Sequence, residues 1–261
     1  MRINSRNISA TFLFLASILV CSVALGQQDC PQFFAGGQAP ILTSQTLTTK
    51  YRQLCNSGFA IGHSGLTRTP LWGAELLTKQ DIDEGRGYAR QDNFRSDTRL
   101  LAGERSELQH YSRSGYDRGH VVNNRDLPPE KRDESFLLSN IVPQDPENNR
   151  GIWSGIESAA RYEAKKRRQV YVVTGPIFQG QTLQSLKGRV AIPTGLFKCL
   201  YDPQQQQAGC YVVANAPGDQ YNATTVADVE NMTGINIFPA MPSQVKNYAM
   251  RLPKPRILGG R

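Results

Sequence analysis

The amino-acid sequence predicts an α+β fold in which helices flank a central antiparallel sheet. Short β-branched and aromatic runs recur between glycine, proline and threonine, a pattern typical of strands. Helical periodicity is confined to residues 149–168 and 225–234, and these stretches do not alternate regularly with strands. The 261 residues are 39% hydrophobic and 20% charged, a composition that one domain with an ordinary core accounts for.

The N-terminal segment, residues 1–26, has the pattern of a signal peptide. Arg2 and Arg6 precede an apolar stretch, and Ala24-Leu25-Gly26 offers small residues for cleavage. The apolar stretch is shorter than the roughly 20 residues that span a bilayer as a helix. We therefore expect an exported protein, periplasmic or extracellular, with a retained anchor or a lipid on Cys21 as the alternatives.

Residues 27–56 are polar and turn-rich, and we interpret them as an N-terminal strap that precedes the main domain at 57–261. The cysteines that follow the signal are Cys30, Cys55, Cys199 and Cys210. An even number of cysteines in an exported protein suggests two disulfides. Three ways of pairing them exist, and the formation of short loops favours Cys30 with Cys55 and Cys199 with Cys210.

Apolar runs bounded by turn residues are the candidate strands of the sheet: residues 59–62, 71–76, 170–174, 189–192, 195–201 and 209–214. Before the third run, residues 149–168 carry apolar side chains three and four positions apart, which predicts an amphipathic helix. Cationic residues in the last turn of this helix complement its dipole. A second, short helix is predicted at 225–234, where Gly234 ends it.

Lysine and arginine number 30 against 22 aspartates and glutamates, which gives a net charge of +8. This excess suits DNA or RNA as a partner, because cations that neutralise phosphates release condensed counterions. Basicity alone does not identify the partner, since many exported proteins are equally basic. Residues 86–107 are loop-like and rich in arginine, where solvated charge and phosphate contact are even alternatives.

Among the three histidines, His120 is the candidate for chemistry. It ends the sequence DRGH at 117–120, in which a cation, a flexible glycine and an imidazole follow one another. Hydrolysis of a phosphodiester needs a base for water, positive charge on the phosphate oxygens and stabilisation of the leaving oxygen. Imidazole, guanidinium and a divalent cation supply these three functions. We interpret His63 and His110 as structural.

A second polar cluster opens the longer predicted helix. Residues 139–144 read SNIVPQ, and Asn149, Trp153 and Glu157 then share one stripe of the helix at i, i+4 and i+8. The rise between Asn149 and Glu157 is about 12 Å, too long for both side chains to ligate one ion directly. Asn149 is therefore a candidate metal ligand, with Glu157 holding one of the ion's waters, and helix capping is the alternative role for Asn149.

With these residues the sequence resembles the DNA/RNA non-specific endonuclease family, whose active site is a ββα-metal, or His-Me, finger. The resemblance rests on DRGH at 117–120, on SNIVPQ at 139–144 and on the helix that carries Asn149, Gly151, Trp153 and Glu157. It continues through YVVTGP at 171–176, residues 192–198 and Thr233-Gly234, so it covers roughly residues 57–245.

The resemblance implies a role for each residue of the site. His120 is the general base, and Asn149 is the sole protein ligand of one Mg²⁺, with Mn²⁺ as an alternative metal. Glu157 orients metal-bound water, Arg118 contacts the phosphate, and Asn140 supports the site from the adjoining segment.

The family also implies an arginine upstream of the histidine that stabilises the transition state, and Arg90 and Arg95 are the two candidates. Asp117 is interpreted as structural, fixing the turn that presents the histidine. The chain departs from the family's pattern at Asn123, where proline is usual, and at Arg150, where an amide is common. Neither position carries the core chemistry, so we expect these departures to affect substrate contacts or loop conformation before activity.

The expected function is hydrolysis of DNA and RNA, without sequence preference, to products that carry a 5′-phosphate. Contacts to the phosphate backbone carry no sequence information, and attack at a metal-bound phosphate needs no 2′-hydroxyl. Two alternatives stay open. One is a basic exported protein that binds nucleic acid without catalysis, and the other is a phosphodiesterase of narrower substrate range.

Overall fold

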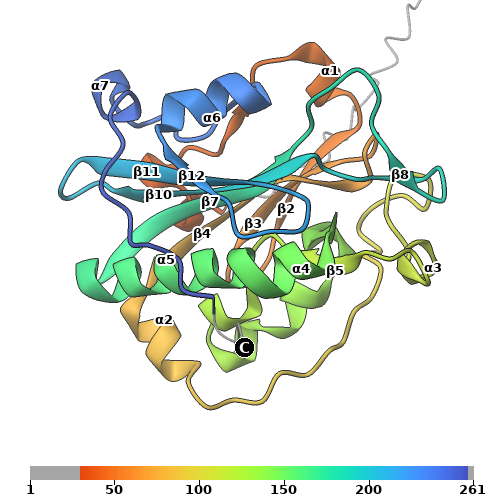
Figure 1. The fold of residues 1–261 in the computed structure, drawn as a ribbon. Helices are drawn as coiled ribbons and strands as arrows, with labels where there is room; N and C mark the ends of the chain where they lie inside the picture. Colours follow the sequence, from red (N-terminus) through yellow and green to blue (C-terminus); the bar gives the residue numbers. More distant parts are fainter. Residues whose placement is uncertain (1–29, 258–261) are drawn as a thin grey trace, which may run out of the picture.

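The computed structural model describes residues 30–257, so the predicted signal peptide and Cys21 lie outside the described residues. One antiparallel sheet of seven strands forms the centre of the molecule, in the order β12-β11-β10-β7-β4-β3-β2 (Figure 1). Its strands are β2 (Tyr51–Cys55), β3 (Ala60–Ser64), β4 (Thr69–Thr78), β7 (Gln169–Ile177), β10 (Gly195–Asp202), β11 (Gln207–Ala214) and β12 (Asn222–Thr224). The α+β fold with a central antiparallel sheet is confirmed.

The predicted strap differs from the structure in one respect. Its last part is β2, which pairs with β3 from Tyr51 opposite Ser64 to Cys55 opposite Ala60 and forms an edge of the sheet. The alternation of β2 is weak because most of its side chains are half-buried, as expected for an edge strand. Residues 51–55 of the predicted strap therefore belong to the central sheet.

Side chains alternate between the two faces of the sheet along β10. On β10, Leu196 and Leu200 pack into one core cluster, whereas Phe197, Cys199 and Tyr201 pack into another on the opposite face. The face of Leu196 is called the helix face below, and the face of Phe197 the disulfide face.

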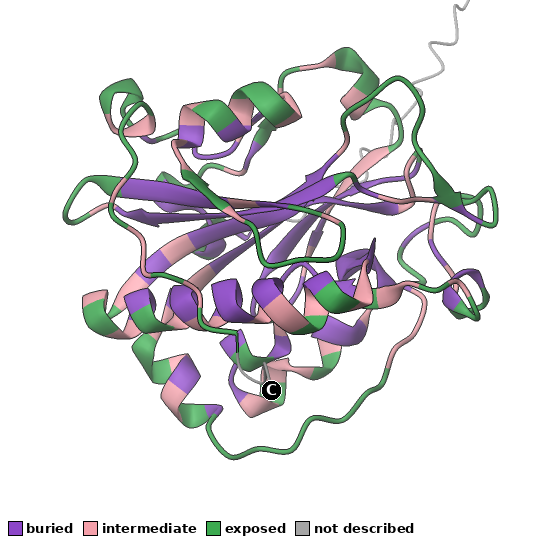
Figure 2. Ribbon diagram, viewed as in Figure 1, coloured by how far each residue is buried: buried purple, intermediate pink, exposed green. Residues whose placement is uncertain are grey.

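Helix α5 (Ser154–Arg167) covers the helix face, where it contacts β4, β7 and β10. Its inward residues are buried and its outward residues half-buried or exposed (Figure 2). The chain enters α5 through α4 (Pro146–Asn148) and one wide π turn, η7 (Asn149–Trp153). Beside them lies a hairpin of β5 (Asp117–His120) and β6 (Ile141–Gln144), so two strands and a helix form the predicted finger. α2 (Lys79–Glu84) packs against α5.

The disulfide face is covered by α6 (Val226–Thr233) and by the N-terminal turns η1 (Pro31–Phe33) and η2 (Ala35–Gly37). Both predicted disulfides are confirmed: Cys30–Cys55 ties the N-terminal turns to β2, and Cys199–Cys210 joins neighbouring strands. Gly234 ends α6 in the left-handed conformation, at φ 68°. No helix within residues 30–257 is long and apolar enough to cross a membrane.

Short elements complete the described chain. They are β1 (Ile41–Leu42), β8 (Ser185–Leu186), β9 (Val190–Ala191), β13 (Ile235–Asn236), α1 (Gln45–Thr48), α3 (Leu108–Tyr111), α7 (Ser243–Lys246), η3 (Asn124–Asp126), η4 (Pro129–Lys131), η5 (Asp133–Phe136) and η6 (Leu138–Asn140).

Candidate active site

The hairpin of β5 and β6 presents His120 at the end of β5. Gly119 is required at this point, because a Cβ there would lie 2.1 Å from Oε1 of Gln144. Gln144 is fully buried, and its amide donates to Oδ1 of Asn148 at 2.8 Å. The glycine of DRGH therefore lets the hairpin pack against the buried amide that holds Asn148, next to Asn149.

Two phenylalanines hold the His120 ring. The ring centroids of Phe94 and Phe136 lie 5.4 Å and 5.2 Å from that of His120, and the two phenylalanines meet edge to face at 5.0 Å. Within residues 30–257, Nε2 of His120 is buried without a hydrogen-bond partner. Packing against the two phenylalanines therefore fixes the imidazole.

Burial lowers the pKa of His120 to about 3, and the neighbouring cations Arg90 and Arg118 lower it further, against the opposing influence of Asp92. A lowered pKa suits a base, because above its pKa the His120 ring is neutral and can accept a proton. His120 is accordingly unprotonated at neutral pH.

Asn140 fixes the segment that follows His120. Its Oδ1 accepts from the amide of Val122 at 2.9 Å, and its Nδ2 donates to the carbonyls of Val122 and Ser135, each at 2.9 Å. The side chain is fully buried, and all its hydrogen bonds are to backbone. Asn140 therefore positions the loop that carries the histidine.

Asn149 is oriented by Asp117. Its Nδ2 donates to Oδ2 of Asp117 at 2.9 Å, which leaves its carbonyl oxygen Oδ1 as the atom available to a metal ion. Arg150 holds the same carboxylate in a fork, with Nε to Oδ2 at 2.9 Å and Nη2 to Oδ1 at 2.7 Å. Arg150, one of the departures from the family's pattern, thus reinforces the Asp117–Asn149 contact.

Glu157 lies in the first turn of α5 and is buried. Burial raises the pKa of Glu157, although Arg161 and Lys198 oppose the rise. Asn123, which lines the same cavity, opposes the rise as well, and it caps η3 by accepting from the amide of Arg125 at 2.8 Å. The second departure from the family's pattern therefore supplies a partner for the site's carboxylate.

These side chains surround a cavity of about 210 Å³ between the hairpin, η3 and α5. His120, Arg118, Asn149 and Glu157 line it together, as the sequence predicted that one site would unite them. Arg90, Asn123, Asn124, Arg125, Arg150, Ser154 and Arg161 complete the lining. The cavity therefore combines a histidine, an amide and a carboxylate with several arginines around them. The guanidinium groups can donate hydrogen bonds to a phosphate.

Of the two candidate arginines, Arg90 and Arg95, the structure places Arg90 at the cavity. Arg90 lines the cavity, and its Cζ lies 5.5 Å from the centroid of the Phe136 ring. Cζ of Arg118 lies 4.2 Å from the centroid of Phe94. The phenylalanines that hold the histidine therefore also hold two cations beside it.

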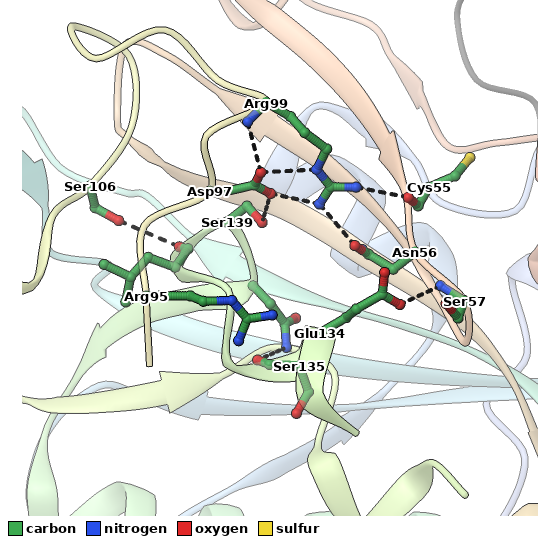
Figure 3. A network of polar contacts seen from close by, with 12 residues as sticks. Cys55, Asn56, Ser57, Arg95, Asp97, Arg99, Ser106, Glu134, Ser135 and Ser139 are labelled. Atoms are coloured by element: carbon green, nitrogen blue, oxygen red, sulfur yellow. Dashed lines mark hydrogen bonds and ion pairs between the residues drawn. The ribbon is translucent and has the colours of Figure 1, made fainter. Parts of the chain in front are cut away.

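Arg95 points elsewhere, into a structural network (Figure 3). Its Nη2 binds Oδ2 of Asp133 at 2.6 Å. In the same network Asp97 accepts from Ser139 at 2.7 Å and from Arg99, whose guanidinium also reaches the carbonyl of Cys55 at 2.9 Å. These bonds attach the arginine-rich loop to the neighbouring segment and to β2.

A buried ion network lies beneath Glu157, on the helix face of the sheet. Nη1 of Arg161 donates to Oδ1 of Asp126 at 2.8 Å, and Nζ of the fully buried Lys198 lies 3.9 Å from both Asp126 and Glu75. Burial and the Asp126 carboxylate raise the pKa of Glu75 well above its usual range, against the opposing influence of Lys198 and Arg161. The network thus brings the carboxyl groups of Glu75 and Asp126 together with the cations Arg161 and Lys198.

The residues present fit a hydrated divalent ion better than a fully protein-ligated one. Among residues 30–257 no group of three or more histidine, cysteine, aspartate or glutamate side chains could enclose a metal. One pre-oriented amide oxygen beside one carboxylate leaves most ligand positions to water. Mg²⁺ commonly retains several waters in this way.

Sequence reasoning missed several of these residues. Phe94, Phe136, Asp126 and Glu75 come from four separate segments, and only the fold brings them to His120 and Glu157. Arg161 carried a local signal, since it follows Glu157 by one helical turn and so faces the same cavity.

Comparisons with known proteins agree with the geometry. The sequence profile of the DNA/RNA non-specific endonuclease family matches residues 37–244. Mitochondrial nuclease EXOG of Danio rerio is 34% identical over 199 residues, which is 68% of this chain and 58% of the relative. Mitochondrial endonuclease G of Bos taurus is 28% identical over 85% of this chain and 81% of its own length. Nuclease C1 of Cunninghamella echinulata var. echinulata is 32% identical over 69% of this chain and 80% of its own length.

A solved structure shares the fold. A crystal structure of the EndoG/EndoGI complex superposes with a TM-score of 0.65 and covers 75% of this chain and 88% of that chain. The two sequences are 24% identical, so this likeness concerns the fold alone. The chain spans less than two thirds of the length of the zebrafish relative, which is therefore the longer protein.

Proposed function

The chain belongs to the DNA/RNA non-specific endonuclease family, and from this premise we propose that it is a hydrolase that cuts DNA and RNA internally, with His120 as general base. One observation carries the proposal: a neutral, packed imidazole shares a single cavity with Arg90, Arg118, Asn149 and Glu157. A nucleic-acid-binding protein without catalysis would have no need of a base in that place.

The chain's own residues perform the following work. His120 takes a proton from the attacking water, and Arg90 and Arg118 bind the non-bridging oxygens of the phosphate. Phosphate binding neutralises the two cations that lower the pKa of His120, so the histidine becomes a stronger base once substrate is bound. Attack from the side of His120 expels the 3′ oxygen, and the product carries a 5′-phosphate.

We propose Mg²⁺ as the metal, with Mn²⁺ as a substitute, bound through Oδ1 of Asn149. Asp117 holds the amide in orientation, and Glu157 binds water in the same cavity. When bound, the ion supplies positive charge beside the phosphate and the leaving oxygen.

Recognition through phosphate and sugar explains indifference to base sequence and to the 2′-hydroxyl, so we propose both DNA and RNA as substrates. We also propose that the protein is exported after removal of residues 1–26. The two disulfides support an oxidising compartment, whereas two of the relatives above are named as mitochondrial.

The test uses the purified protein with supercoiled plasmid and with total RNA, each with Mg²⁺ and with EDTA. Nicking and linearisation of the plasmid, degradation of the RNA, 5′-phosphate ends and complete loss in EDTA are expected. Binding of both nucleic acids without cleavage at any metal concentration would contradict the proposal that the protein is an enzyme. Cleavage of only one polymer would establish the narrower phosphodiesterase instead.

A further inference from the structure

The C-terminal segment, residues 249–257, runs across the outer side of α5, beyond the last residue of the family match (Figure 1). It is fixed in place. The amide of Met250 donates to the carbonyl of Ala208 at 2.6 Å, and the hydroxyl of Tyr211 donates to the carbonyl of Pro253 at 2.7 Å. Leu252 packs against the core cluster beneath α5. A side chain on Gly155 would lie 3.0 Å from the carbonyl oxygen of Arg256, so helix and segment touch closely.

A groove of about 830 Å³ lies between this segment and α5, and we call it the C-terminal groove. Its prominent side chains are Tyr162, which is 61% exposed, and the exposed cations Lys166, Arg251, Lys254 and Arg256. Lys254 and Arg256 alternate with the half-buried Pro253 and Pro255, an arrangement that holds both cations outward.

Positive charge in the groove is not compensated locally. Glu163, which also lines it, is buried and bound by Arg167 at 2.7 Å and by Lys166 at 3.6 Å. Within the described part of the chain, no carboxylate lies within 4.0 Å of Arg251, Lys254 or Arg256. The groove therefore offers three free cations and one exposed aromatic ring.

The groove begins where the catalytic cavity ends. Ser154 and Glu157 line the cavity, whereas their neighbours Gly155 and Ser158 line the groove, so the first two turns of α5 separate the two hollows. A strand that leaves the cavity over this part of the helix meets Arg256 first.

We propose that the C-terminal groove binds the phosphate backbone of the nucleic acid that flanks the scissile bond, with a base stacked on Tyr162. This inference rests on the proposed function and adds a second binding site to it. Cations that follow a backbone, interleaved with an aromatic platform, are the usual means of holding a single strand without sequence preference. The expected consequence is tighter binding of long substrates than of oligonucleotides that fill only the cavity.

The experiment compares the full chain with the triple variant Arg251→Ala, Lys254→Ala and Arg256→Ala. Binding of a fluorescent single-stranded DNA of 30 nucleotides is measured by anisotropy in EDTA, over a series of salt concentrations. A matched control replaces Lys50, Lys187 and Arg189 by alanine, since these are exposed and likewise have no carboxylate within 4.0 Å in the described chain. We expect only the groove variant to bind about 10- to 100-fold more weakly. The slope of its log affinity against log salt concentration should also become less steep by about 2.

Tyr162→Ala should weaken binding about 10-fold, and Tyr162→Phe should restore it, because stacking needs the ring and not the hydroxyl. Cleavage of a hexanucleotide should be equal in all of these proteins. If the groove variant kept its affinity and its salt dependence and cut plasmid normally, the groove would not be a nucleic-acid binding site. The proposed function would then remain intact. Failure of the unaltered protein to cut DNA would overturn the proposed function itself.

Discussion

The two faces of the central sheet bury different kinds of side chain. Successive residues of β10 illustrate the contrast: Phe197 lies among apolar side chains on the disulfide face, and Lys198 lies beneath α5 on the helix face. On β4, Trp72 and Ala74 belong to the first face, whereas Glu75 faces the ion network of the second.

This difference shows how one sheet serves two purposes. Apolar burial and the Cys199–Cys210 bridge stabilise the fold from the disulfide face at no cost in buried charge. The helix face carries buried ions whose desolvation costs free energy and which stability alone does not require. Its charges position Glu157 and Arg161 at the cavity, so substitutions of these ions should affect activity as well as stability, whereas substitutions on the other face should affect stability alone.

His120→Ala should give the largest effect. It removes the base, so kcat should fall by roughly 10²- to 10⁴-fold while the melting temperature and the Mg²⁺ requirement change little. In the unaltered protein the pKa of His120, lowered to about 3, should keep kcat/KM from falling as the pH drops through 6.5. Near-normal rates in the alanine variant, measured on one DNA substrate across an Mg²⁺ titration, would mean that another group is the base.

Asn149→Ala should come next. Loss of the oriented carbonyl oxygen should lower turnover by about 10²- to 10³-fold, the several kcal/mol that a metal contributes, and the remaining activity should need more Mg²⁺. Glu157→Ala, which leaves Asn149 in place, should cost about 10- to 100-fold. Rates against Mg²⁺ concentration distinguish the two, and the reverse order of severity would move the metal away from Asn149.

Lys198→Met tests the ion network. The substitution leaves Asp126 and Glu157 facing Arg161 alone, and an uncompensated buried charge costs about 3–5 kcal/mol of unfolding free energy. Asp126→Asn in the same chain removes one negative charge and should recover most of that loss. Urea unfolding of the two single variants and the double variant measures the coupling. Additive losses would show that Lys198 and Asp126 act independently.

Sequence reasoning predicted the parts of this molecule that local pattern determines. His120 follows a contiguous motif, and the strands follow runs of β-branched residues. The continuous helix predicted from residue 149 was wrong in its first turn, because Gly151 (φ −100°, ψ −106°) interrupts it within η7 and α5 begins only at Ser154. Sequence reasoning left Arg90 and Arg95 undecided, because the choice depends on which guanidinium meets the Phe136 ring and which meets Asp133.

The buried ion network was the other feature that could not be predicted from the sequence. Lys198 lies between Leu196 and Leu200 on one face of β10. The alternation of the strand predicts that face but does not indicate that the cation on it is buried. Its partners Glu75 and Asp126 lie far away in the chain. A pairwise contact of this kind follows from packing in three dimensions and not from local pattern.

The smallest effect is expected on the disulfide face, where Cys199→Ala with Cys210→Ala should lower stability and spare activity. The bridge joins directly opposed residues of β10 and β11 and closes a sequence separation of 11, for which chain entropy accounts for about 3 kcal/mol. Both sulfurs point away from the cavity, because Cys199 alternates with Lys198. Unfolding in urea and plasmid cleavage at 25 °C are to be measured on the same preparation, with the reduced wild-type protein as control. If cleavage fell while most of the protein remained folded, the two faces would be coupled, and the division of labour between them would not hold.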